Sequence, residues 1–207
     1  MRDFAGGIVV HASAGFAGLA SVLYLGRRKL VDSPHNIPFI ALGVGLLWFG
    51  WYGFNSGSEL KLDGITALAF LNTTLSAAFA SVTWLLLEWG SARKPHFVGL
   101  LSGAVAGLAC ITPACGYVPI WASVVIGIAA GVVCYSAIGL KKRLHWDDAL
   151  DVWGVNELGR VQAPLLFPAD VHRRDQVGQP EHLGEAAYTF DGPIVAETQK
   201  TTPAASG

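Results

Sequence analysis

One side chain that can carry a proton lies deep within a long uncharged stretch of this sequence, and that side chain is His11. We expect the stretch to form a helix that begins about eight residues earlier, which places the imidazole about 12 Å from the helix end. An ionisable residue there costs free energy unless it has a partner, and by default it marks a pore or a proton path. The alternative is a neutral histidine that hydrogen bonds between helices and only stabilises their packing.

Two further features accompany this histidine. Asp3 stands at the start of the same helix, where a carboxylate accepts hydrogen bonds from free N–H groups, and capping alone would explain it. An aromatic run, residues 48–54, passes into small polar residues up to Ser58. Aromatic residues near a membrane surface usually form an interfacial belt, which the composition favours. Their faces also attract ammonium-type cations within about 6 Å, so a cation vestibule is the second interpretation.

The elements that carry these residues belong to a membrane. The 207 residues are 52% hydrophobic and 14% charged, well below the roughly 25% charge of a soluble domain. Residues 97–140 contain no Asp, Glu, Lys or Arg, a run twice the length of one membrane span. The net charge of −1 provides no basic excess for a nucleic-acid partner. We therefore predict an all-α integral membrane protein and not an enzyme.

Charges and turn residues divide the sequence into five predicted transmembrane helices of about 20 residues each. They span residues 4–25, 38–57, 64–87, 97–113 and 119–140. The last two are separated by Pro113, Gly116 and Pro119, which predict a tight turn at the membrane surface. Small residues recur at four-residue spacing, which lets helices approach closely in lipid. They are Gly99, Gly103 and Gly107 on one helix and Gly127 and Gly131 on the next.

Cysteines and an early small-residue pattern have simpler explanations. The spacing of Cys110, Cys115 and Cys134 matches no zinc or haem motif, so we predict three buried apolar residues and neither a metal nor a cofactor. Residues 12–14 resemble a signal-peptide cleavage site, but the apolar stretch before them is too short. We expect that segment to remain in the bilayer.

The distribution of basic residues predicts the orientation. Eight lysines and arginines fall on one side of the five spans and two on the other. The eight are Arg27, Arg28, Lys29, Arg93, Lys94, Lys141, Lys142 and Arg143, and the two are Arg2 and Lys61. This bias places the N-terminus outside and the C-terminus in the cytoplasm, across a plasma or inner membrane. We divide the chain into a transmembrane domain, residues 1–156, and a largely irregular or disordered cytoplasmic tail, residues 157–207.

Several segments resemble the ammonium transporter (Amt/Mep/Rh) family. Residues 3–11, D-F-A-G-G-I-V-V-H, look like its signature, and residues 51–58, W-Y-G-F-N-S-G-S, are similar to its W-F-G-F-N-x-G-S segment. Residues 102–116 and 147–155 resemble its eighth span and the start of its tenth. The resemblance implies a partial ammonium-transporter fold that covers roughly the fifth to ninth spans, the start of the tenth and part of the tail.

The same resemblance implies roles for particular residues. His11 would be the first of two pore histidines, Phe54 part of an aromatic gate, Ser58 part of an ammonium-recruiting site and Asp3 its support. The implied protein is a homotrimer in the lipid bilayer with one pore per subunit. Removing the hydration shell of a charged ammonium ion costs much free energy. Passing neutral ammonia through an apolar lumen would avoid most of this cost. The imidazoles would carry the proton separately.

The chain also departs from the family pattern. It begins at the fifth span, and Asn156 stands where the second pore histidine is expected. An amide takes up no proton near neutral pH, so a two-histidine relay cannot run through it. Residues 181–190 resemble a tail element through which the family binds a PII-type regulatory protein.

Three hypotheses follow from the resemblance and these departures. The first is an ammonium transporter subunit with impaired conduction. The second is a non-conducting membrane remnant or regulatory protein that binds PII through its tail. The third is that a second polypeptide supplies the missing spans.

Overall fold

The computed structural model describes residues 3–26 and 36–144 as a set of helices, without a strand among these residues. The five α-helices are α1 (Gly7–Leu25), α2 (Ile37–Asn55), α3 (Gly64–Ala92), α4 (Phe97–Ile111) and α5 (Ile120–Leu144). A short 3₁₀ helix, η1 (Ser56–Glu59), follows α2 directly. Each predicted span corresponds to one of these helices, so the predicted all-α fold is confirmed.

Four of the described helical segments are long and apolar enough to cross a membrane. They are Gly7–Leu25, Ile37–Glu59, Gly64–Ser91 and Ile120–Gly139. The remaining helix, α4, is apolar but has 15 residues. At 1.5 Å per residue it rises about 22 Å, less than the roughly 30 Å of a hydrocarbon core. The fourth predicted span, residues 97–113, is therefore a shorter helix than the sequence suggested.

Among the differences between the predicted and the observed helix boundaries, those of α1 and α3 bear on the ionisable residues. α1 begins at Gly7 and not at residue 4, because Gly6 adopts a left-handed conformation with φ of 76° that ends the helix on its N-terminal side. α3 continues past residue 87 to Ala92 and so includes Glu88. His11 is therefore not alone as an ionisable side chain within these apolar helices.

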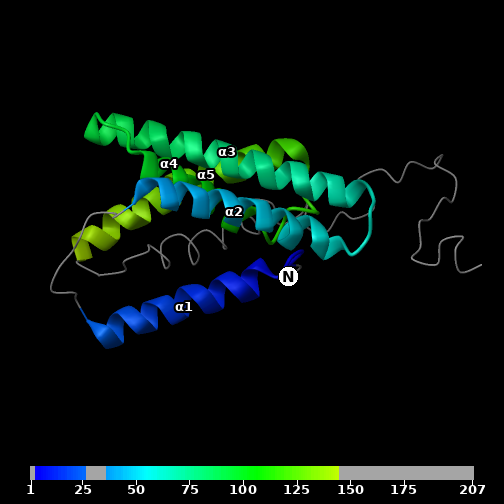
Figure 1. The fold of residues 1–207 in the computed structure, drawn as a ribbon, viewed down its shortest axis with the longest axis horizontal. Helices are drawn as coiled ribbons and strands as arrows, with labels where there is room; N and C mark the ends of the chain where they lie inside the picture. Colours follow the sequence, from blue (N-terminus) through cyan, green and yellow to red (C-terminus); the bar gives the residue numbers. More distant parts are fainter. Residues whose placement is uncertain (1–2, 27–35, 145–207) are drawn as a thin grey trace, which may run out of the picture. The chain divides into compact units, whose positions relative to one another are not determined.

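The closest packing joins α3, α4 and α5, which lie side by side in Figure 1. Gly103 and Gly107 of α4 meet residues 76–84 of α3, and a Cβ at Gly107 would lie 2.7 Å from the Ala77 Cα. Gly131 of α5 meets the same stretch, where a Cβ would lie 2.8 Å from the Thr83 Cβ. The predicted close approach at the small residues is confirmed, with α3 as the shared partner.

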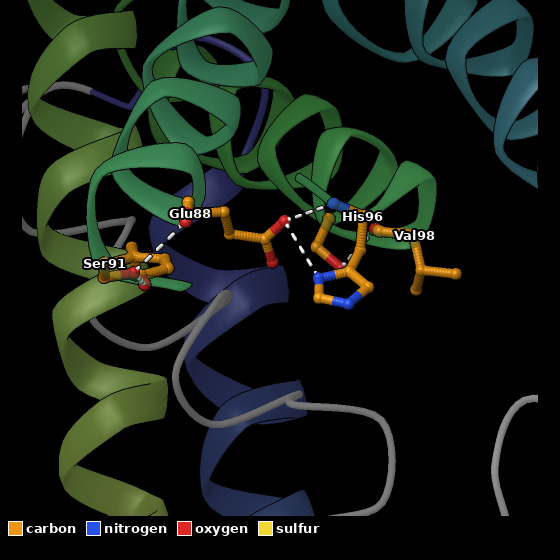
Figure 2. A network of polar contacts seen from close by, with 6 residues as sticks. Glu88, Ser91, His96 and Val98 are labelled. Carbon is orange, nitrogen blue, oxygen red and sulfur yellow. Dashed lines mark hydrogen bonds and ion pairs between the residues drawn. The ribbon is translucent and has the colours of Figure 1, made fainter. Parts of the chain in front are cut away.

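Glu88 closes the turn between α3 and α4 (Figure 2). Its Oε2 atom accepts a hydrogen bond of 2.8 Å from the His96 backbone N–H and lies 3.6 Å from His96 Nδ1. A carboxylate at this place satisfies a free N–H group and complements the helix dipole at the start of α4. A side chain at Gly99 would collide with the same carboxylate.

α1 and α2 expose large apolar side chains along most of their length. Examples are Val9, Phe16 and Tyr24 on α1 and Phe39 and Phe49 on α2. Such surfaces suit contact with lipid or with further transmembrane helices. The buried core of the described residues accordingly belongs to α3, α4 and α5.

Gly107→Ala should destabilise the chain by about 1–3 kcal/mol, because the added methyl group collides with the backbone of α3. Thermal unfolding of the purified chain in detergent measures this. Gly90→Ala is the matched control, since a Cβ at Gly90 in α3 meets nothing within 4 Å and alanine favours a helix. Equal melting temperatures for the two variants would contradict the proposed contact between α3 and α4.

Candidate functional site

The segment before α1 is fastened to the turn that joins α4 to α5. The Phe4 backbone N–H donates to the Pro113 carbonyl over 3.0 Å, and the Phe4 ring meets Tyr117 edge-on with centroids 5.2 Å apart. Asp3 Oδ2 accepts a hydrogen bond of 2.7 Å from the Ile8 N–H, which satisfies a free donor at the start of α1. These contacts place the first turn of α1, and with it His11, against the rest of the chain.

Residues 112–118 of the turn itself are buried. The fully buried amide of Asn72 on α3 donates to the carbonyls of Cys115 and Val118, both over 2.8 Å. The predicted tight turn is confirmed, and α3 and Phe4 cover it within the protein. Its location at the membrane surface stays a prediction. A turn can be buried in this way because a side chain supplies the donors that its carbonyls need.

His11 lies between aromatic rings and is 4% exposed. Its imidazole stacks on Trp51 of α2, with ring centroids 5.3 Å apart and planes inclined by 20°. Phe54, one helical turn further along α2, meets the imidazole edge-on at 6.2 Å and Trp51 at 5.9 Å. His11 Nε2 is buried without a hydrogen-bond partner among the described residues.

A hydrogen bond fixes the Trp51 ring. Its Nε1–H donates to Thr112 Oγ1 over 2.9 Å, and that hydroxyl donates to the Leu108 carbonyl over 2.7 Å. Neither Trp51 nor Thr112 was among the predicted site residues, and the two lie 61 positions apart. The available signal was the spacing of Trp51 and Phe54, because residues three apart share a face of a helix.

The aromatic run on α2 has several environments. Trp51 and Phe54 face His11, whereas Tyr52 stacks on Phe70 of α3 at 4.0 Å and its hydroxyl hydrogen bonds with Thr74 over 3.0 Å. Phe49 is 76% exposed. Only part of the run can therefore act together with the histidine.

The other predicted site residues have separate settings. Ser58 lies on η1, and its hydroxyl donates to the Phe54 carbonyl over 2.6 Å. Asp3 Oδ1 is buried without a hydrogen-bond partner among the described residues. The structure thus brings His11 and Phe54 into ring contact, with Asp3 at the start of α1. Asn156, the predicted domain boundary and the tail segment 181–190 lie outside the described residues.

The three cysteines are buried, as predicted. Within residues 3–26 and 36–144 no cluster of three or more His, Cys, Asp or Glu side chains is arranged to hold a metal ion. The chemistry that this region offers is proton exchange at an imidazole and cation attraction by aromatic faces.

Four apolar helices among the described residues, each long enough to cross a membrane, define a multi-pass helical membrane protein. The sequence model of the Ammonium Transporter Family matches residues 1–168, and the chain belongs to this family.

Two ammonium transporters and a solved structure of Mep2 are similar to this chain. The ammonium transporter of Bacillus subtilis is 50% identical over 160 residues, which cover 76% of this chain and 40% of that protein. The ammonium transporter Amt1 of Archaeoglobus fulgidus is 39% identical over 201 residues, or 95% of this chain and 49% of its own. The crystal structure of Candida albicans Mep2 superimposes with a TM-score of 0.74 at 42% identity, covering 80% of this chain and 38% of Mep2. The chain thus spans less than half the length of these relatives.

Asp3→Ala should cost about 1 kcal/mol of stability, because the Ile8 N–H then loses its acceptor at the start of α1. Asp3→Asn retains an acceptor oxygen and is the matched control, with stability close to that of the wild type. Thermal unfolding in detergent compares the three proteins. If both variants lost the same stability, the carboxylate charge and not the hydrogen bond would be what stabilises α1.

Proposed function

We propose that this chain forms part of a membrane pathway for ammonium, in which His11 handles the proton and neutral ammonia crosses the apolar region. The observation that carries the proposal is the buried imidazole, stacked on Trp51 and bordered by Phe54, whose Nε2 has no hydrogen-bond partner in the part of the chain that the structure describes. Membership in the Ammonium Transporter Family and relatives named as ammonium transporters support it.

The surroundings of His11 favour ammonia over a bare ion. Aromatic and aliphatic side chains offer a cation little replacement for its water shell, so a charged ammonium ion pays a large desolvation cost there. Ammonia carries no charge and pays much less. Histidine is the side chain best suited to exchange a proton near neutral pH, which lets the proton and ammonia separate at this position.

Ser58 and Asp3 are suited to the charged form of the substrate. The one hydroxyl proton of Ser58 is donated to the Phe54 carbonyl, so its oxygen presents lone pairs to other donors. Asp3 contributes a carboxylate whose Oδ1 has no partner among the described residues. Both groups can accept hydrogen bonds from ammonium N–H groups, and we assign them to recruitment.

The remaining parts of the proposal rest on the resemblance. Because the chain spans less than half the length of its relatives, we expect it to conduct poorly by itself. An outside N-terminus, a cytoplasmic tail after residue 156, a homotrimer and a PII-type partner remain predictions. We do not propose a second function.

A chimera tests the pathway without depending on how much of the relatives' length this chain spans. Residues 3–144 replace the matching segment of the B. subtilis ammonium transporter, and methylammonium uptake is measured in cells that lack their own transporters. We expect uptake by this chimera and little by the chain alone. A chimera that reaches the membrane in normal amount yet gives no uptake would refute the proposed pathway.

His11→Asn in this chimera should lower uptake at least about tenfold, equivalent to about 1.4 kcal/mol in the barrier, because an amide cannot take up the proton. His96→Gln is the matched control. The His96 side chain is mostly exposed at the start of α4, and its bond to Glu88 through the backbone survives the change. Equal uptake by the two variants would exclude a proton-handling role for His11.

A second chimera, extended through residue 156, tests the replaced histidine. We expect it to transport less than the first chimera, because Asn156 then occupies the position that the resemblance assigns to the second pore histidine. Asn156→His should restore uptake. Unchanged uptake after this reversion, at equal expression, would show that the amide does not impair conduction.

A further inference from the structure

Trp51 covers one face of the His11 imidazole, and its own ring is held from a third helix. We propose that Thr112, at the end of α4, is a positioning residue whose hydroxyl holds the Trp51 indole flat against His11. The inference deepens the proposed function, since it concerns the same histidine, but its test does not require transport.

The hydrogen bond sets the rotation of the indole. Tryptophan has a single polar group, the Nε1–H, which usually finds an acceptor when it is buried. Thr112 Oγ1 accepts it over 2.9 Å. The Thr112 hydroxyl proton is donated to the Leu108 carbonyl over 2.7 Å, so a lone pair of Oγ1 is left to accept the indole N–H. The resulting indole plane is inclined by 20° to the imidazole plane.

Other tryptophans show that burial alone does not produce this arrangement. The Nε1 atoms of Trp48 on α2 and Trp84 on α3 are buried without a hydrogen-bond partner among the described residues. Trp84 instead meets Tyr135 through its ring, edge-on at 5.6 Å. Trp51 thus differs from Trp48 and Trp84, because its Nε1–H is hydrogen-bonded within the described residues and its ring stacks on a histidine.

Thr112 also occupies a fixed place. The residues that follow Thr112 are buried in the turn to which Asn72 donates hydrogen bonds. The Thr112 methyl group faces α1, since a Cβ added at Gly7 would lie 2.7 Å from Thr112 Cγ2. The methyl group thus packs toward α1 while the hydroxyl binds the indole of α2. Two substitutions separate these roles. Thr112→Val keeps the volume and loses the hydroxyl, and Thr112→Ser keeps the hydroxyl and loses the methyl group.

The test is NMR of the full chain in lipid nanodiscs, with labelled tryptophan and histidine side chains. Trp51→Phe and His11→Asn assign the two signals. In the wild type we expect a nuclear Overhauser effect between the Trp51 indole N–H and Thr112, and an upfield ring-current shift of the His11 ring protons. Thr112→Val should abolish the ring-current shift and speed solvent exchange of the indole N–H. Thr112→Ser should retain the ring-current shift of the His11 ring protons and the slow solvent exchange of the indole N–H.

Two results would overturn the proposal. One is a wild-type spectrum without the contact between the Trp51 indole N–H and Thr112, which decides the matter even if Thr112→Val fails to fold. The other is an unchanged His11 shift in folded Thr112→Val. Uptake by the chimera separates this inference from the proposed function. The expected NMR signals without any uptake would refute the proposed function and leave the positioning role of Thr112 intact. Uptake without these signals would refute the positioning role and leave the proposed function intact.

Discussion

The bonds from Asn72 to the turn between α4 and α5 are the constraint on which the site depends. Backbone carbonyls in apolar surroundings need donors, and an unpaired one costs about 1–3 kcal/mol. Asn72 supplies donors for both Cys115 and Val118. The turn then presents Pro113 to the segment before α1 and Thr112 to α2. Through these contacts one buried amide on α3 fixes where the histidine and its aromatic neighbour meet.

Small residues allow this arrangement to form within a membrane. Lipid offers no hydrophobic force between helices, so α3, α4 and α5 hold together through close packing and interhelical hydrogen bonds. Ser76 illustrates both, because it packs against Gly107 and Gly127 and also donates to the Gly107 carbonyl over 2.9 Å. Bulky apolar side chains face outward on α1 and α2, the reverse of a soluble protein's preference.

The spans were predictable because a hydrophobic run of sufficient length has few alternatives to a membrane helix. His11 was predictable for a related reason, since an ionisable residue stands out against apolar sequence. The contact between Trp51 and Thr112 was not, because hydropathy and periodicity describe one helix at a time and say nothing of a hydrogen bond across 61 positions. The extension of α3 through Glu88 was missed for the same reason, since the N–H group that accommodates its carboxylate belongs to the next helix.

For the proposed ammonium pathway, the position of His11 offers one atom that would serve both forms of the substrate. Nε2 is buried and has no partner among the described residues, so it gains from any small polar molecule that reaches it. An imidazole with its proton on Nε2 donates to the lone pair of ammonia, and one with a lone pair there accepts from an ammonium N–H. Trp51 and Phe54 keep the ring in place during either exchange. The orientation of the imidazole, set from α2 and through Thr112 from α4, therefore matters as much as its capacity to bind a proton.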